Sequence, residues 1–137
     1  MEKSFIDTII IIYAHDKKDP QKQQKAIALL KSVMQNRSGI ISTRVLQEYA
    51  FLAIKKLKQA HGVVIRQVKL LETLEVINQS ADQICRAVEI MHSYQINFWD
   101  SCIISNAEQA DCSVIFSEDL NAGQFYSGIK IVNPFVS

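Results

Sequence analysis

Glycine and proline are scarce in this 137-residue chain, which contains four of the first and two of the second. Such a composition argues against a protein built mainly of loops or flexible linkers. Hydrophobic residues make up 48% of the sequence and charged residues 21%, which places the chain in the globular class rather than the disordered one. We therefore expect a single domain over residues 1–137 with a substantial core.

A long hydrophobic run is also missing. No apolar stretch approaches the roughly 18 to 20 uninterrupted residues that a membrane-spanning helix requires. Near the N-terminus Lys3 is accompanied by Glu2 and Asp7, and no signal-peptide cleavage region follows. These absences predict a cytoplasmic protein that makes no contact with a membrane.

Cysteine is represented only by Cys85, Cys102 and Cys112, an odd number without the close spacing of a metal site. Each lies within or beside an apolar pattern, which favours small buried thiols over redox or zinc roles. The three histidines pair with no nucleophile and share no metal-type spacing. A Cys–His catalytic site therefore finds no support.

The net charge is only +1, so any contact with nucleic acid must use a local patch rather than a global basic field. One group of lysines surrounds a predicted loop and helix start: Lys17, Lys18, Lys22 and Lys25. A second group lies at a predicted helix end: Lys55, Lys56 and Lys58. Such lysines usually form a solvated face or stabilise a helix C-terminus, but they can also contact phosphates.

Short apolar segments alternate with helical patterns along the whole chain. Short strands are expected at 4–7, 40–41, 76–77, 113–116 and 129–132. Helices are expected at 8–14, 21–34, 43–58, 63–74, from Ser80 or Asp82 onward, and at 98–110. The segment SEDLNAGQFYSG reads as a polar loop. This alternation predicts an α/β fold with a central parallel sheet of short strands flanked by helices.

Helical periodicity also predicts which side chains face the core. In the helix that begins near Ser80, the residues expected to face inward are Ile84, Cys85, Val88 and Met91. In the helix over 98–110 they are Trp99, Cys102, Ile103 and Ala107. The aromatic residues Tyr13, Tyr49, Phe98 and Trp99 are expected in the core rather than on a base-stacking surface.

Acidic residues follow the predicted strands. Asp7 ends the first strand, and Glu118 and Asp119 follow the strand at 113–116. Glu48 lies early in the helix after the second strand, and Asp100 starts a later helix. Because sites in open parallel sheets form beyond the carboxyl ends of the strands, four carboxylates can converge on one edge.

Clustered carboxylates repel one another, and a divalent cation relieves that repulsion. Mg²⁺ and Mn²⁺ prefer oxygen ligands, and such a site suits hydrolysis of a phosphodiester. Each acid also has a purely structural interpretation. Asp7 can cap a helix, Glu48 can be a solvated helix residue, Asp100 can favour a helix N-terminus, and Asp119 can stabilise a turn.

Three further polar residues lie beside these acids. Thr8 and Ser117 are candidates for substrate binding, through a bond to a phosphate, or for orienting an acid. Glu118 could approach a metal through water, although adjacent side chains on a strand-like segment point apart.

Three segments carry these acids: FIDTIIIIYA with Asp7, STRVLQEY with Glu48, and INFWDSCIISNAEQADCSVIFSEDLNAGQFYSGIKIVNPF with Asp100 and Asp119. Through them the chain resembles the PIN-domain nucleases, and within these the VapC-type toxins of toxin–antitoxin pairs. The resemblance extends from Phe5 to Phe135. WDS, SEDLNAGQ and NPF together are its strongest part.

The resemblance implies a three-layer PIN-like fold and Mg²⁺- or Mn²⁺-dependent endoribonuclease activity on RNA. It also implies a small antitoxin protein that blocks the acidic site, and a homodimer. Asp7, Asp100 and Asp119 would hold the metal, directly or through water. Glu48 would complete the cage or orient the attacking water.

One departure from the family pattern keeps a second hypothesis open. The family usually places asparagine two residues after the first aspartate, where this chain has Ile9. The chain could therefore be a catalytically weakened PIN-like module that binds RNA or an antitoxin without cleavage. A third hypothesis, an acid-cluster phosphatase or phospho-receiver, requires a lysine near the acids at a strand end, and none is expected there.

Overall fold

The computed structural model describes residues 2–136, and its strands form one sheet in the order β3-β2-β1-β4-β6-β5. Their bounds are β1 Ser4–Ile6, β2 Gly39–Ser42, β3 Glu75–Ile77, β4 Val114–Phe116, β5 Phe125–Tyr126 and β6 Ile129–Val132. Every neighbouring pair is parallel except β5 and β6. The expected strands are thus present, each with its ends within one residue of the predicted bounds.

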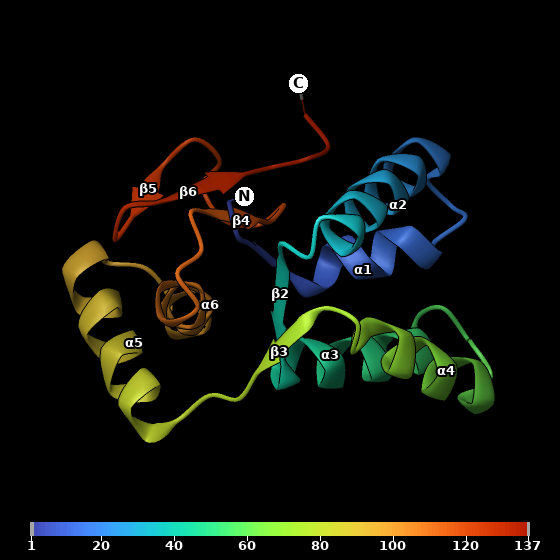
Figure 1. Ribbon diagram of the computed structural model, residues 1–137, viewed down its shortest axis with the longest axis horizontal. Helices are drawn as coiled ribbons and strands as arrows, with labels where there is room; N and C mark the ends of the chain where they lie inside the picture. The colour runs from blue at the N-terminus through green and yellow to red at the C-terminus, as the bar shows by residue number, and fades with distance from the viewer. Residues whose placement is uncertain (1, 137) are drawn as a thin grey trace.

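Helices cover both faces of this sheet. They are α1 Thr8–His15, α2 Pro20–Gln35, α3 Thr43–Lys55, α4 His61–Leu71, α5 Ala81–Tyr94 and α6 Phe98–Gln109. Helices α1 to α4 lie on one side of the strands, and α5 and α6 lie together on the other side (Figure 1). The predicted three-layer α/β architecture is confirmed. Within residues 2–136, no helix combines the length and the apolar character needed to cross a membrane.

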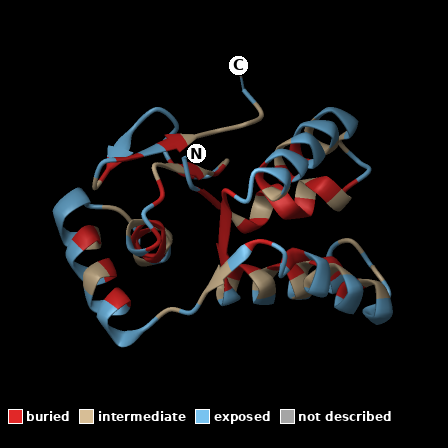
Figure 2. Ribbon diagram, viewed as in Figure 1, coloured by how far each residue is buried: buried red, intermediate tan, exposed pale blue. Residues whose placement is uncertain are grey.

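The central strands are buried on both faces, which is why their sequences are apolar without alternation. Phe5 and Ile6 of β1 and Ile41 of β2 have no exposed surface, and neither has Ile115 of β4. Figure 2 shows the buried residues concentrated in these strands and in the helix faces turned toward them. The segment after β1 is equally apolar, yet it forms helix α1, because Asp7 caps it and helices α2 and α3 pack against it.

Strand β5 was not predicted, because Phe125 and Tyr126 lie in the segment expected to be a loop. Two residues, Ser127 and Gly128, connect β5 to β6, with φ values of 52° and 78°. Positive φ at both positions of a two-residue connection is typical of the turn that matches the twist of a hairpin. The antiparallel edge strand therefore depends on local turn geometry rather than on an apolar pattern.

The predicted inward face of α5 is wrong. Gln83, Ala87 and Ile90 are the buried residues of this helix, whereas Ile84 is 45% and Val88 47% exposed. The backbone N–H and side chain of Ser80 exchange hydrogen bonds with Gln83, so a capping box helps fix how the helix begins. The buried face packs on α6, and the more apolar residues one position further along are left outside.

Because a different face of α5 is buried from the one predicted, one of the cysteine predictions is also wrong. Cys85 lies on the outer side of α5 and is exposed, contrary to the expectation of a buried thiol. Cys102 and Cys112 are buried as predicted, and burial raises the pKa of the Cys112 thiol to about 12.

Gly39 begins β2 at a point where there is no room for a side chain. A Cβ atom there would lie 2.7 Å from Leu74 Cδ2 and 2.8 Å from Val33 Cγ2.

We expect Gly39→Ala to lower the free energy of unfolding by about 1–3 kcal/mol through overpacking. In the matched control Gly62→Ala, in helix α4, the added Cβ meets no atom within 4 Å. That change should be neutral or stabilise by up to about 1 kcal/mol. Urea unfolding of both variants checks this, and equal midpoints would contradict it.

Candidate active site

Strands β1 and β4 are neighbours, but the chain leaves them in opposite directions across the sheet. From β1 it proceeds to β2 on one side, and from β4 it proceeds to β5 and β6 on the other. Such a reversal leaves a crevice beyond the carboxyl ends of the two strands, where ligands bind in open α/β sheets. Asp7 follows β1 directly, and its backbone N–H donates to the Phe116 carbonyl at 3.1 Å. Ser117 to Asp119 follow β4 at the same edge.

A cavity of about 150 Å³ opens at this edge. Its lining residues are Asp7, Ser42, Arg44, Val45, Glu48, Trp99, Asp100, Cys102, Ile103, Asn106 and Asp119. The structure thus brings the four predicted carboxylates to one cavity from four separate segments. Asp7 is the most enclosed of the four acids, and Asp119 is exposed.

Asp7 combines a structural role with a position in the cavity. Its Oδ1 accepts from the Thr8 backbone N–H at 2.8 Å and so caps α1, while Oδ2 accepts from the Ser117 hydroxyl at 2.9 Å. The pKa of the Asp7 carboxyl is raised to about 6, chiefly by burial and to a smaller extent by the nearby charges of Glu48 and Asp119, while the two hydrogen bonds oppose the shift. The negative charge on Asp7 is therefore costly unless a cation compensates for it.

The two hydroxyl residues predicted beside the acids both bond to them. Ser117 is fully buried, and its Oγ also accepts from the backbone N–H groups of Asp119 at 3.2 Å and Leu120 at 3.3 Å. Thr8, 5% exposed, donates from Oγ1 to Glu48 Oε1 at 2.8 Å. Ser117 thereby connects Asp7 to the turn that carries Asp119, and Thr8 connects the start of α1 to Glu48.

Asp100 lies in the first turn of α6. Its backbone N–H donates to the Asn97 side chain at 2.8 Å, and the Asn97 amide donates to Asp100 Oδ2 at 2.7 Å. Burial raises the pKa of the Asp100 carboxyl, the bond from Asn97 lowers it, and the charge of Asp119 raises it. The charge of Asp119 therefore acts on Asp100 across the cavity.

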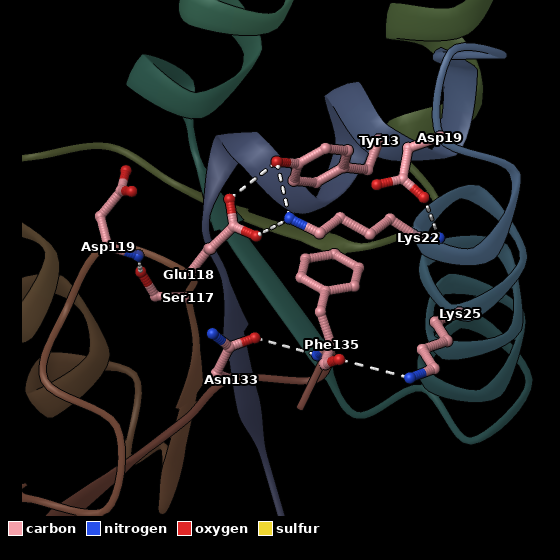
Figure 3. A network of polar contacts seen from close by, with 9 residues as sticks. All are labelled: Tyr13, Asp19, Lys22, Lys25, Ser117, Glu118, Asp119, Asn133 and Phe135. Carbon is pink, nitrogen blue, oxygen red and sulfur yellow. Dashed lines mark hydrogen bonds and ion pairs between the residues drawn. The ribbon is translucent and has the colours of Figure 1, made fainter. Parts of the chain in front are cut away.

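Glu118 points away from the cavity, in a different direction from its neighbour Asp119 (Figure 3). It accepts from the Tyr13 hydroxyl at 2.8 Å and forms an ion pair with Lys22. The Lys22 Nζ atom also lies 4.7 Å from the centroid of the Tyr13 ring and 5.5 Å from that of Phe135. The Glu118 carboxylate is thus occupied outside the cavity and is not placed to approach a metal through water.

The side chains of the cavity suit a hard divalent cation, although they do not form a closed cage. Within residues 2–136, no three histidine, cysteine, aspartate or glutamate side chains lie close enough together to hold an ion as they stand. Asp119 is exposed and Asp100 is partly exposed, so both have room to turn. The donor atoms are oxygens, as Mg²⁺ and Mn²⁺ prefer.

Asn106 is a lining residue that the sequence interpretation missed. It is 2% exposed, and its Oδ1 atom is buried without a hydrogen-bond partner. An unpaired buried amide oxygen is costly, and a bound cation or its water would satisfy it. The signal in the sequence was an asparagine in the interior of an apolar helix, where this residue is a poor helix former.

Trp99 is not a core residue, contrary to prediction. It is 58% exposed and lines the cavity next to Asp100. Helix α6 buries Cys102, Ile104 and Ala107 further along, whereas its first turn extends to the crevice at the sheet edge. The group above the Trp99 ring is the Arg44 guanidinium, whose Cζ atom lies 4.0 Å from the ring centroid. Arg44 is a second lining residue that the sequence interpretation did not single out.

The two groups of lysines identified in the sequence are partly brought together. A cleft of about 610 Å³ lies at the C-terminal ends of α1 and α3, and its lining residues are His15, Asp16, Lys17, Lys18, Lys56, Leu57, Lys58 and Gln59. Lys22 and Lys25 lie elsewhere, with Lys22 bound to Glu118 and Lys25 donating to the Phe135 carbonyl. Since α1 has eight residues, the basic cleft lies about 12 Å beyond the helix end that carries Asp7.

The fold of this chain is shared by solved toxin structures. A Klebsiella pneumoniae toxin–antitoxin complex matches with a TM-score of 0.73 and 21% identity, covering 96% of this chain and 98% of that one. Mycobacterium tuberculosis VapC20, described as a sarcin–ricin loop cleaving toxin, matches at 0.70 and 18%, covering 93% and 99%. Rickettsia felis VapBC2 bound to a promoter DNA fragment matches at 0.67 and 19%, covering 93% and 96%.

At the level of sequence, no curated protein matches the chain. The model of the PIN domain family matches residues 4–126, which include all four carboxylates of the cavity. The central, mostly parallel sheet flanked by helices agrees with this match. The chain therefore belongs to the PIN domain family.

Proposed function

We propose that the protein is a Mg²⁺- or Mn²⁺-dependent endoribonuclease and the toxin of a cytoplasmic toxin–antitoxin pair. The observation that carries this proposal is the cavity at the β1/β4 crevice, which collects Asp7, Glu48, Asp100 and Asp119. The elevated pKa of the Asp7 carboxyl supports it, because a carboxylate that is buried, with Glu48 and Asp119 near it, favours a bound cation.

In this proposal Asp7, Asp100 and Asp119 hold the ion, directly or through water. When bound, the ion neutralises and polarises the phosphodiester and lowers the pKa of a water molecule. Ser117 and Thr8 act as positioning residues, because their hydroxyls donate to Asp7 and Glu48. Glu48 completes the oxygen cage or orients the attacking water for in-line displacement at phosphorus.

An RNA substrate requires cationic groups around the acidic cavity, since phosphates are otherwise repelled. Arg44 lies at the cavity, and Lys17, Lys18, Lys56 and Lys58 lie together in the basic cleft beyond the far end of α1. We propose that the cleft contacts the phosphate backbone of an RNA that also reaches the acids.

The antitoxin and the homodimer require apolar surface, and the helices supply it. Large apolar side chains that are exposed include Phe51 at 61%, Ile54 at 46%, Ile65 at 53% and Leu70 at 51%. A groove of about 440 Å³ next to Glu48 is lined by Phe51 and Leu52. Exposed apolar patches of this kind mark interaction sites. An antitoxin segment in this groove would lie beside the acids and block them.

The alternative function, an RNA- or antitoxin-binding PIN module without cleavage, rests on Ile9. This side chain is partly buried and packs against the core, so it offers no polar group where the family usually has asparagine. If that asparagine is essential for ordering the site, the protein binds RNA but does not cut it.

Purified protein freed of any partner separates these two functions. It is incubated with a mixed cellular RNA pool in Mg²⁺, in Mn²⁺ and with chelator, beside the variant Asp100→Asn. Discrete fragments that disappear in the variant and with chelator support the nuclease. Absence of cleavage by a folded protein that still retards RNA in a gel supports the binding module, and Ile9→Asn should then restore cleavage.

Glu118 and Asp119 are neighbours with opposite expected roles. We expect Asp119→Asn to reduce cleavage by more than about tenfold, because Asp119 lines the cavity. Glu118→Gln should change cleavage less than about threefold, because Glu118 bonds to Tyr13 and Lys22 outside the cavity. Initial rates on one RNA at saturating Mg²⁺ compare the two variants. Equal losses of cleavage rate in the two variants would contradict the assignment of Asp119, and not Glu118, to the site.

A further inference from the structure

The rim of the acidic cavity carries an exposed aromatic side chain. Trp99 is the single tryptophan of the chain, and it is 58% exposed although it is one of the largest apolar side chains available for burial. It precedes Asp100 in the first turn of α6 and lines the same cavity as the four acids. Its outward position leaves ring surface free directly beside the carboxylates.

Arg44 joins Trp99 from another element, the first turn of α3. Its guanidinium lies over the Trp99 ring, with Cζ 4.0 Å from the ring centroid, and its Nη2 atom lies 3.6 Å from Glu48 Oε2. Glu48 in turn accepts from Thr8. The guanidinium is therefore held between an acid of the cavity and an exposed aromatic ring, and it brings positive charge to an otherwise acidic rim.

We propose that Trp99 and Arg44 form a nucleobase-binding subsite in which one unpaired base of an RNA strand stacks on their planar groups. This inference rests on the proposed function and names the feature of RNA that the site would bind next to the cleaved bond. Single-stranded RNA is bound by stacking of bases on aromatic rings and on arginine guanidinium planes. A base is uncharged, so it can approach the carboxylates where a phosphate without a bound cation would be repelled.

The position of the pair also suggests what the subsite does. Because Trp99 is adjacent to Asp100, a base stacked on its ring would lie beside the acids, and the phosphate attached to that nucleotide would be brought into the cavity. Trp99 would thus fix the position of the nucleotide next to the scissile bond by stacking on its base, and would take no part in the bond cleavage itself.

Intrinsic fluorescence tests this directly, because Trp99 is the only tryptophan. The Asp119→Asn variant, which keeps Trp99, Arg44 and Asp100, is titrated in Mg²⁺ with a five-nucleotide RNA. The same titration uses an abasic oligomer of equal length. The inference predicts strong quenching by the RNA and little change with the abasic chain, which offers phosphates but no bases to stack.

Kinetics of the otherwise wild-type protein supply a second measurement. Trp99→Leu should raise KM for a short single-stranded RNA by roughly 5- to 150-fold, with kcat changed less than about threefold. Trp99→Phe should restore most of the loss, and Arg44→Lys, which keeps the charge without the plane, should be intermediate. Phe125→Leu is the matched control, since Phe125 is 61% exposed on β5 and does not line the cavity. Thermal unfolding verifies that each variant is folded.

The outcomes distinguish this inference from the proposed function. If wild type cleaves RNA but Trp99→Leu has an unchanged KM and RNA does not quench the fluorescence, the subsite is overturned and the nuclease stands. Quenching by a purified protein partner and not by RNA also overturns it, because the rim is then a protein contact. If wild type cleaves no RNA yet is quenched by RNA and not by the abasic chain, the subsite is supported and the nuclease fails.

Discussion

Asp7→Asn is expected to abolish RNA cleavage while making the metal-free protein more stable at pH 8. Activity should fall by more than about 100-fold, because even residues that only orient metal ligands cost roughly 10- to 100-fold when replaced. Asparagine keeps an oxygen that can accept from the Thr8 N–H, and it is a good helix cap. The backbone geometry of α1 should therefore survive the change.

The gain in stability follows from the sign of the pKa shift. The folded protein raises the pKa of the Asp7 carboxyl from 3.8 to about 6, so the folded state binds this proton more tightly than the unfolded state does. The protonated Asp7 carboxyl therefore stabilises the folded state fully below about pH 4, and this contribution to the free energy of unfolding is lost as the pH rises toward 7. This loss of folding free energy is at most about 3 kcal/mol, and an uncharged asparagine avoids it. Part of the gain is offset because asparagine weakens the hydrogen bond that Ser117 donates to Asp7.

Thermal unfolding in chelator at pH 5 and pH 8, with cleavage assays beside it, measures both effects. The matched control is Asp82→Asn, an exposed aspartate in the first turn of α5, which should leave cleavage unchanged. Full activity in Asp7→Asn would remove Asp7 from the site. A large loss of stability at pH 8 would show that the charged carboxylate is favoured by the fold and needs no cation.

Divalent metal binding is expected to weaken strongly between pH 7.5 and pH 5. An ion competes with protons for the carboxylates that hold it. The pKa of Asp7 is about 6 and that of Asp100 is raised by burial, so at pH 5 the ion must displace at least one proton. We expect the Kd for Mn²⁺ to be about tenfold weaker or more at pH 5, since each displaced proton weakens binding about tenfold per pH unit.

Calorimetric titration with Mn²⁺ at the two pH values measures this linkage. In Asp7→Asn the remaining binding should be weak and should depend less on pH in this window. Glu118→Gln serves as the control, because Glu118 lies outside the cavity and its loss should leave the pH dependence intact. A Kd that is equal at both pH values would contradict the assignment of the buried carboxylates as ligands.

Much of the fold could be predicted because its strands are short, apolar and buried on both faces. Burial of Phe5, Ile41 and Ile115 leaves no room for polar alternation, so the parallel sheet is evident from the sequence. A general property of such sheets then predicted that Asp7 and Asp119, which follow strands, would meet at one edge. The structure places both in the cavity at that edge.

What could not be predicted depends on how elements pack in three dimensions. The periodicity of α5 fits two adjacent faces, and the buried one contains Gln83 rather than Ile84 because packing on α6 and a capping box select it. Trp99 has an apolar pattern around it, yet the first turn of α6 lies at the crevice and Arg44 arrives there from α3. A local sequence pattern cannot predict such a contact between segments that lie far apart in the chain.

The presence of a divalent cation among the four carboxylates is the claim on which the function depends, and it can be observed directly. Crystals soaked in Mn²⁺ give an anomalous signal that locates the ion. We predict a peak in the cavity, bonded at about 2.2 Å to a carboxylate oxygen of at least one of Asp7, Asp100 and Asp119, and its loss in Asp100→Asn crystals. Peaks only at other surface carboxylates, with an empty cavity at saturating Mn²⁺, would contradict the account.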